Sequence, residues 1–169
     1  SRLRADGVDA SAVRLALPSR VLSNDDILEL VHQHSQHSFA GDLKKTLALV
    51  ERMLVHSGAK QRRWCGPRER VLDMVAQAVE AALADVGCRK SDVDLLICAG
   101  VDRAFAEPAD AYFMAHALGF ATAQCFDVVD ACNGWIRAIQ LAEGLLRMGA
   151  HQRILVINSE FNQFDGGAV

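Results

Sequence analysis

The residues with the clearest chemical potential form one short segment around Cys132. Residues 124–129 (QCFDVV) are apolar and rich in β-branched side chains, which predicts a short buried strand. After Cys132, apolar residues recur at helical spacing up to Gly149: Ile136, Ile139, Leu141, Leu145 and Leu146. The sequence therefore predicts that a strand delivers the Cys132 thiol to the first turn of a helix.

A thiol at a helix N-terminus is a candidate nucleophile. The unpaired N–H groups and the partial positive charge of a helix start favour thiolate over thiol. This effect is too small to complete the activation, so a second polar group is expected elsewhere. The structural alternative is a buried thiol that only packs, since free cysteine is among the most buried residue types.

The rest of the chain reads as alternating strands and helices, which is typical of an α/β sheet. The run 95–99 (LLICA) is continuously apolar and predicts a central parallel strand covered on both faces. The other predicted elements are a strand at 12–17, a helix of about two to three turns after Ser23, helices at 42–57, 69–86 and 108–118, and a strand after Gly149. Residues 100–108 then form the loop at the carboxyl end of the 95–99 strand, where open α/β sheets place ligands.

Composition sets ordinary bounds on the function. The chain has 169 residues, 51% of them hydrophobic, and a net charge of −3, which suits one soluble α/β domain with an ample core. This composition implies neither a nucleic-acid nor a membrane partner. There is no apolar run of about 18 residues and no secretory signal. We therefore expect a cytoplasmic protein.

The five cysteines are an odd number without a CxxC pair, and we expect them to be reduced. Cys98 and Cys125 lie in apolar strands and are expected to be buried thiols. The histidine-rich segment 32–38 (HQHSQHS) has no neighbouring cysteine or carboxylate pair, so it predicts a solvated helix end instead of a metal site. We expect neither a metal nor a cofactor.

The segment 130–135 (DACNGW) resembles the nucleophile segment of the ketoacyl-ACP synthase III branch of the thiolase superfamily. Further similar segments follow the family's order: 17–26 (LPSRVLSNDD), 57–63 (SGAKQRR), 91–100 (SDVDLLICAG) and 149–157 (GAHQRILVI). The resemblance covers residues 12–160 and implies a thiolase-like αβα(βα) sandwich. That fold is duplicated, so residues 1–169 are expected to form its N-terminal half, with the C-terminal half outside them. The tail 164–169 (FDGGAV) resembles the family's Phe-Gly-Asp-Gly-Ala-Gly strand.

The resemblance implies an acyltransferase in which Cys132 forms an acyl-enzyme from an acyl thioester of acyl carrier protein or coenzyme A. It also implies condensation with a malonyl-type thioester to a β-ketoacyl product, in fatty-acid or polyketide-type biosynthesis, by a homodimer. The His and Asn that stabilise the decarboxylating substrate belong to the second half of the family's fold. Acyl transfer to a hydroxyl or an amine, and a non-catalytic partner subunit that positions a carrier protein, stay open as alternatives.

Three more residues are candidates for substrate binding. Arg62, in a basic and aromatic cluster, could contact a phosphate or phosphopantetheine, or could hold loops together through carbonyls and acids. Trp135 could select the acyl chain or pack under the helix. Glu107 matches the position at which the family inserts an apolar residue into the partner's acyl pocket.

Glu107 is a departure from the family, because an unpaired carboxylate in a dry acyl pocket is costly. It implies a polar pocket, another orientation of Glu107 or a substrate other than a simple acyl chain. A second departure concerns coenzyme A. The family's adenine-stacking Trp matches Arg52 by spacing, and a helping Arg matches His56, which favours a carrier-protein donor.

Overall fold

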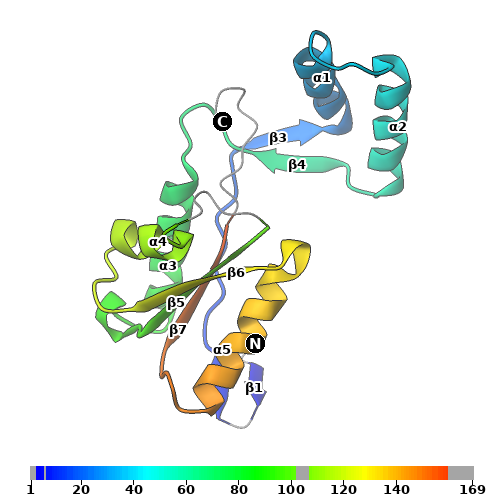
Figure 1. Ribbon diagram of the computed structural model, residues 1–169. Coiled ribbons are helices and arrows are strands. Elements are labelled where there is room, and N and C mark those ends of the chain that lie inside the picture. The colour runs from blue at the N-terminus through cyan, green and yellow to red at the C-terminus, as the bar shows by residue number, and fades with distance from the viewer. Residues whose placement is uncertain (1–2, 6, 102–106, 160–169) are drawn as a thin grey trace. The chain divides into compact units, whose positions relative to one another are not determined.

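The computed structural model describes residues 3–5, 7–101 and 107–159, with side chains from residue 7 onward. The chain divides into two units. The first unit combines residues 1–16 with 70–163, and the second combines 17–69 with 164–169. Each unit is described by itself below (Figure 1).

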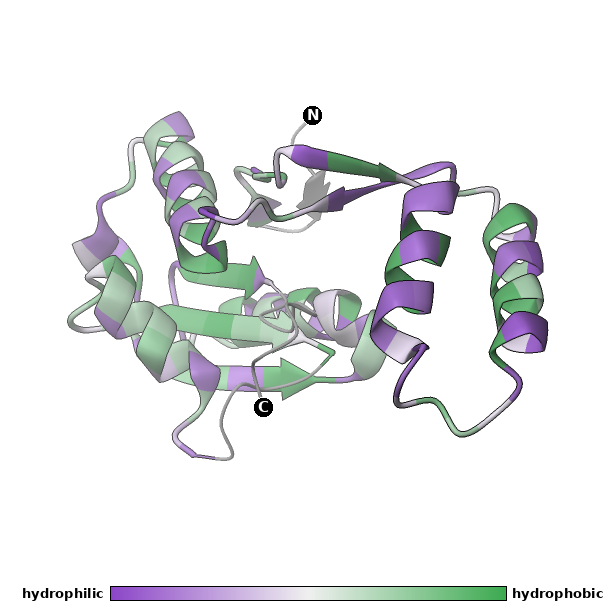
Figure 2. Cartoon of the chain, turned by 90° about the horizontal axis from the view of Figure 1, so that it is seen from above, coloured by the Kyte–Doolittle hydropathy of each residue, from purple (hydrophilic) through white to green (hydrophobic). Residues whose placement is uncertain are grey.

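A three-stranded parallel sheet forms the centre of the first unit. Its strand order is β6 (Gln124–Val129), β5 (Leu95–Gly100), β7 (Ile154–Asn158). All six residues of β5 are buried, which confirms the central strand predicted from the apolar run. Figure 2 shows these strands as mainly hydrophobic. The register pairs Cys98 with Asp127 and Gly100 with Val129, so β5 and β6 end together.

Helices cover both faces of this sheet. The helices α3 (Val71–Asp85) and α4 (Asp110–Leu118) pack on the face that receives Leu96 and Cys98. The helix α5 (Gly134–Arg147) packs through Ala138 and Ala142 on the opposite face, against Leu95, Ile97 and Ala99. Alternate residues of β5 thus point into the two layers, as a strand with a side-chain period of two requires. The unit is an αβα sandwich, and the α/β fold class is confirmed.

The smaller elements of the first unit lie outside the sandwich. The strands β1 (Leu3–Ala5) and β2 (Val8–Ala10) form an antiparallel pair. Two short 3₁₀ turns are η1 (Lys90–Asp92) and η2 (Ala131–Asn133). The turn η2 connects β6 to α5 and carries Cys132.

The second unit is an antiparallel pair of strands with two helices. The strands are β3 (Arg20–Ser23) and β4 (Gln61–Trp64), and the helices are α1 (Asn24–Ser35) and α2 (Leu43–His56). A capping box starts α1: the Ser23 hydroxyl accepts from the Asp26 N–H, and the Asp26 carboxylate accepts from the Ser23 N–H. The Ser23 hydroxyl also donates to the Asp26 carboxylate, and this hydrogen bond, together with the one from the Ser23 N–H, lowers the pKa of Asp26. The predicted helices at these positions are confirmed.

The strand predicted at 12–17 is wrong. These residues belong to no strand, and the side chains of Val13 and Leu15 are 66% and 72% exposed. A strand needs a partner for its backbone hydrogen bonds, and no described strand pairs with this segment. The strand that does form starts later, at Arg20.

The thiols are distributed as the sequence indicates. None of the five cysteines, all within the described ranges, forms a disulfide. Cys98 and Cys125 are buried in their strands, which confirms that prediction, and Cys132 is exposed. Burial raises the pKa of the Cys98 thiol, and the negative charges of Asp127 and Asp110 raise it further.

The longest helix, α3, has 15 residues. Among the residues that the structure describes, no helix combines the length and the apolarity that a membrane span requires.

Candidate active site

Cys132 lies on a sharp connection between β6 and α5. The thiol is exposed at the middle of η2 and not in the first turn of the helix, which starts two residues later at Gly134. The sequence predicted Cys132 in the first turn of the helix, and the structure places it in the 3₁₀ turn before the helix. The backbone of Ala131, directly before Cys132, has a positive φ of 43°, which is not a right-handed helical conformation. The Asn133 N–H then closes η2 on the Asp130 carbonyl, at 2.9 Å.

Ala131 is the one non-glycine residue with a positive φ in the part of the chain that the structure describes. A side chain in the left-handed region is strained, typically by ~1–3 kcal/mol. Such strain persists only where the surroundings over-determine the backbone. Here it places the Cys132 thiol on the outside of a tight turn, which is where a nucleophile can be reached.

Gly134 fixes the start of α5 against the central strand. A Cβ atom at Gly134 would lie 3.1 Å from the Gly100 carbonyl oxygen and 3.4 Å from the Val128 carbonyl oxygen. Both neighbours are backbone atoms of the sheet, so they cannot move aside easily. The connection that carries Cys132 is therefore held directly over the carboxyl ends of β5 and β6.

Hydrogen bonds between polar side chains stabilise the backbone around η2. The Asp130 carboxylate accepts from Arg137 Nε at 3.0 Å and from Asn133 Nδ2 at 3.2 Å. The Asn133 side chain, thus engaged, does not cap α5. The partial positive charge at the start of α5 is therefore not offset by a side-chain cap and can act on an anion near Cys132. The sequence signal for this network is the spacing of seven residues between Asp130 and Arg137, which is two helical turns.

Asp127 links the same strand to a second helix. Its two carboxylate oxygens accept from the backbone N–H groups of Asp110 and Ala111, each at 2.8 Å. These groups belong to the first turn of α4, which has no side-chain cap from its own N-cap residue, Ala109. Sequence reasoning missed Asp127, although a single carboxylate within an apolar strand indicates a polar partner.

The structure brings two of the predicted site residues together. Trp135, half-buried in the first turn of α5, directly follows the connection that carries Cys132. Glu107 belongs to the same unit and is exposed. Residues 102–106, which precede it in the predicted ligand-binding loop, lie outside the described residues.

Arg62 belongs to the second unit and lies in strand β4. Its guanidinium Nη1 donates to the side-chain oxygen of Asn24, the first residue of α1. This contact is made with a side-chain amide and not with the carbonyls and acids of the structural alternative, and a phosphate contact stays a prediction. Arg52 and His56, at the positions linked to coenzyme A binding by resemblance, are exposed on α2.

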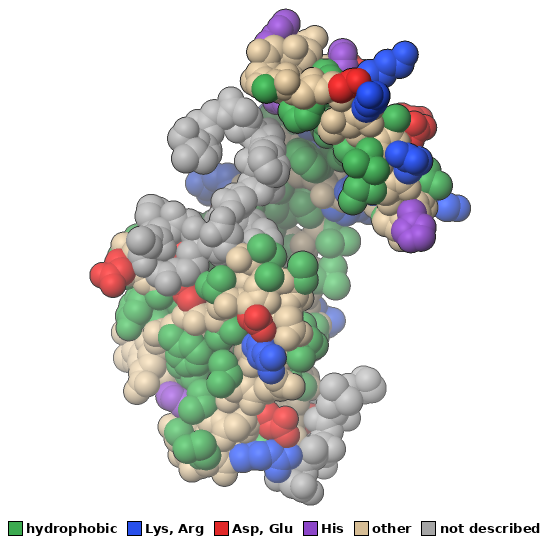
Figure 3. Space-filling view, turned by 45° about the vertical axis from the view of Figure 1, so that its right-hand side comes forward, with side chains coloured by type: hydrophobic (Ala, Val, Ile, Leu, Met, Phe, Trp, Pro, Cys, Tyr) green, Lys and Arg blue, Asp and Glu red, His purple; other side chains and the backbone are tan. Residues whose placement is uncertain are grey.

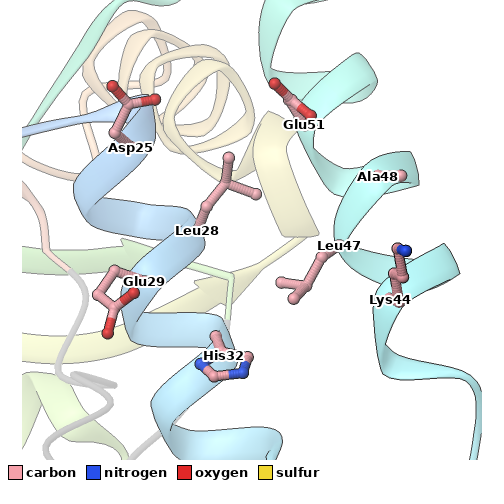
Figure 4. A pocket seen from close by; sticks show the side chains of 8 residues that line it. All are labelled: Asp25, Leu28, Glu29, His32, Lys44, Leu47, Ala48 and Glu51. Atoms are coloured by element: carbon pink, nitrogen blue, oxygen red, sulfur yellow. The ribbon is translucent and has the colours of Figure 1, made fainter.

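An open groove of about 420 Å³ lies between α1 and α2. Figure 4 shows Leu28 and Leu47 between the two helices, with Asp25, Glu29 and Glu51 around them. None of the predicted site residues lines this groove.

Comparisons with known proteins show which family this chain is similar to. The family model of 3-oxoacyl-[acyl-carrier-protein] synthase III matches residues 126–163, the segment from β6 through β7. A relative from Bartonella henselae, named beta-ketoacyl-[acyl-carrier-protein] synthase III, is 32% identical over 145 residues, which cover 86% of this chain and 40% of the relative.

Two solved structures share the fold. A 3-oxoacyl-(acyl-carrier-protein) synthase III matches 89% of this chain and 41% of its own, with a TM-score of 0.66 and 25% identity. A Cys→Ser variant of OleA from Xanthomonas campestris, with bound lauric acid and lauroyl-CoA, matches 89% of this chain and 42% of its own, with a TM-score of 0.69 and 22% identity. The 169 residues span about two fifths of the length of these proteins. Over most of its own length the chain is therefore similar to ketoacyl-ACP synthase III proteins, which supports a ketoacyl-ACP synthase III-like member of the thiolase superfamily.

Proposed function

We propose that Cys132 is the nucleophile of an acyltransferase and takes an acyl group from a thioester. The observation that carries this proposal is the exposed thiol on the strained connection between β6 and α5. The strain at Ala131 and the close contact of Gly134 with Gly100 give the thiol a fixed position at the edge of the sheet where ligands bind in α/β folds. A thiol that only packs would be buried, as Cys98 is.

The first half-reaction forms the acyl-enzyme. The Cys132 sulfur, as thiolate, attacks the carbonyl carbon of the donor thioester and gives a tetrahedral oxyanion. Backbone N–H groups near the start of α5, which lacks a side-chain cap, are suited to stabilise this charge. The intermediate collapses, the bond to the carrier sulfur breaks, and the carrier leaves as a thiolate that takes up a proton.

The second half-reaction is a condensation. A malonyl-type thioester loses CO₂, its carbanion attacks the acyl group on Cys132, and the cysteine leaves as a thiolate. The product is a β-ketoacyl thioester. The groups that stabilise the carbanion, His and Asn in the resembled family, come from the C-terminal half of the fold. We propose that residues 1–169 are the N-terminal half of such a protein.

The surface of the first unit is consistent with a missing second half. Ile136, Ile139 and Leu141 on α5 are between 40% and 51% exposed, and hydrophobic side chains gather at several places on this unit (Figure 3). A helix in a three-layer sandwich that carries apolar residues on its outer side needs a further layer to bury them.

The donor is proposed to be an acyl thioester of a carrier protein or of coenzyme A. The family match and the Bartonella henselae relative are named for acyl carrier protein, and the OleA structure contains lauroyl-CoA. Arg62, Glu107 and Trp135 are the proposed substrate contacts on this chain. The homodimer and the cytoplasmic location stay predictions.

The test is intact-mass spectrometry of the full protein after incubation with a panel of acyl-CoA and acyl-carrier thioesters. We expect a mass gain of one acyl group that disappears in Cys132→Ala. Cys88→Ala, which removes a half-buried thiol, is the matched control and should keep the gain. A folded protein that no donor acylates would overturn the proposal and favour a non-catalytic subunit that positions a carrier protein.

A further inference from the structure

We propose that Arg137 favours the thiolate form of Cys132 by neutralising Asp130. The inference rests on the proposed function of Cys132 as the acyl acceptor. The guanidinium pairs with the carboxylate that lies two residues before the thiol, so that the thiolate does not form beside an unpaired negative charge. Arg137 is thus a positioning residue, which acts on the nucleophile through Asp130.

The charge of Asp130 lies close to the thiol along the chain. Asp130 directly precedes the η2 turn, and Cys132 is the middle residue of that turn. The Cα atoms of residues two apart are separated by at most about 7 Å. This separation is within the Debye length of about 8 Å at physiological salt, and a like charge at such a distance disfavours an anion. An unpaired Asp130 carboxylate would therefore lower the thiolate fraction of Cys132.

Two side chains donate to the Asp130 carboxylate. Arg137 Nε donates to Oδ2 at 3.0 Å, and Asn133 Nδ2 donates to the same oxygen at 3.2 Å. A further contact orients the arginine, because its Nη1 donates to Gln140 Oε1 at 3.2 Å. Of these side chains only Arg137 carries a positive charge, so it and not Asn133 can neutralise the carboxylate.

The stability of α5 gives little reason for an arginine at this position. Arg137 is the fourth residue of α5, and a cation in the first turn is repelled by the partial positive charge of the helix N-terminus. The side chains of Arg137 and Asp130 are 55% and 47% exposed, and ion pairs as exposed as this one contribute little to stability. Charge balance beside Cys132 does account for the pair.

The same helix provides a matched control. Arg147 pairs with Glu143 at 2.8 Å, in an ion pair of comparable exposure. Arg147 lies ten residues beyond Arg137, which is about 15 Å along a helix, so its charge is largely screened from Cys132. Substitution of Arg147 thus removes an equivalent pair from α5 without changing the charge beside the thiol.

Two further carboxylates belong to this region of the sheet. Asp127 in β6 accepts from the N–H groups of Asp110 and Ala111 and therefore lies on the side of α4, and Asp110 is the first residue of that helix. Both carboxylates stay the same in every variant below. Differences between the variants therefore report the charges of Asp130 and Arg137.

The first experiment measures alkylation of Cys132 by iodoacetamide in the full protein at different pH values. The reagent is uncharged, so the rate reports the thiolate and not electrostatic attraction of the reagent. Arg137→Gln keeps a hydrogen-bond donor but loses the charge, and we expect the rate at about pH 7 to fall about three- to tenfold. At about pH 10, where the thiol is largely ionised in every variant, the rate should be no lower than in wild type. Peptide mass spectrometry separates Cys132 from the other thiols.

Further variants distinguish charge from structure. Asp130→Asn removes the negative charge and should keep or raise the rate at about pH 7, and the combination with Arg137→Gln should return it close to wild type. Arg137→Lys keeps the positive charge and should preserve the rate, as should Arg147→Gln. An unchanged rate in Arg137→Gln would overturn the proposal. Equal losses in Arg137→Gln and Asp130→Asn, or no rescue by Arg137→Lys, would show that the pair only stabilises the turn.

The second experiment uses salt. Both charged side chains are about half exposed, so salt at about 1 M, where the Debye length is about 3 Å, should bring Arg137→Gln close to wild type. A loss that does not depend on salt would refute the electrostatic role. Acylation by a thioester donor at about pH 7 should fall in Arg137→Gln as alkylation does. If no donor acylates the wild type, the proposed function fails, and the alkylation rates still decide the role of Arg137.

Discussion

Gly134, the first residue of α5, lies so close to the Gly100 carbonyl oxygen that a Cβ atom would come within 3.1 Å of it. Gly134→Ala therefore forces the helix away from β5, and the Cys132 turn moves with it. We expect a loss of ~1–3 kcal/mol in the free energy of unfolding, typical of overpacking against atoms that cannot yield. Urea denaturation of the full protein measures this loss, and Cys132 acylation should fall in the same variant.

Gly144 provides the internal control for this substitution. It lies in the same helix, and an added Cβ there would meet nothing within 4 Å. Alanine restricts the unfolded chain more than glycine does, so Gly144→Ala should be neutral or stabilising by about 0.5–1 kcal/mol. If both substitutions destabilise the protein to a similar extent, the cause in Gly134→Ala is not the contact with Gly100.

Ala131 gives a second prediction, because its φ of 43° is strained for any residue with a Cβ. Ala131→Gly should keep or slightly raise the melting temperature, while it loosens the turn and slows Cys132 acylation. Ala131→Val adds a β-branched side chain in the same backbone region and should cost a further ~1–2 kcal/mol. Thermal unfolding and the acylation rate, measured on both variants, test this. A Val variant as stable as wild type would contradict the left-handed conformation.

The elements could be predicted from sequence where the signal is local. The apolar run of β5, the periodicity of α2 and α3, and the strand at β6 are patterns that neighbouring residues carry by themselves. The resemblance of the segment around Cys132 to a known family located the candidate nucleophile. Its exact place is in the 3₁₀ turn, two residues before the helix, next to a positive φ at Ala131 that the residue type does not indicate.

The missed features depend on which distant segments meet. The segment 12–17 alternates apolar residues as a strand does, but pairing needs a partner that local sequence cannot supply. Asp127 and Asp110 are seventeen residues apart along the chain and touch only because α4 packs beside β6. Such hydrogen bonds are properties of the folded arrangement, so single-sequence reasoning finds the carboxylate but not its partner.

Asp92 makes stability depend on pH. Hydrogen bonds from the Arg89 side chain and from its backbone N–H lower the pKa of Asp92 to about 2. A lowered carboxyl pKa stabilises the fold above the unfolded value, about 3.9, and this contribution is lost as the pH falls towards 2. We expect Asp92→Asn to lower the urea midpoint at pH 6, and the difference from wild type to shrink between about pH 4 and pH 2. A difference that is constant with pH would contradict this assignment.

The five cysteines should differ in reactivity. Cys132 is exposed, whereas Cys98 is 8% exposed and its thiol pKa is raised by burial. Because the thiolate is the reactive form, iodoacetamide at pH 8 should modify Cys132 first and Cys98 only after unfolding. Peptide mass spectrometry at timed intervals, with a urea-denatured sample as the control, gives the order. Early modification of Cys98 would contradict the buried strand β5.

The two roles predicted for Arg62, a structural one and phosphate binding, can be distinguished through its contact with Asn24. If the guanidinium serves mainly to join β4 to α1, Arg62→Ala and Asn24→Ala should be coupled by about 0.5–1.5 kcal/mol in a double-mutant cycle of unfolding. If it also binds a donor phosphate, only Arg62→Ala should raise the half-saturating donor concentration. Arg63→Ala is the control, because Arg63 lies on the same strand as Arg62 but donates to the carbonyls of Pro18 and Ser19, just before β3. We expect both results: a coupling free energy between Arg62 and Asn24, and a half-saturating donor concentration that rises in Arg62→Ala but not in Asn24→Ala. The reason is that a guanidinium has donors left after one hydrogen bond to an amide oxygen.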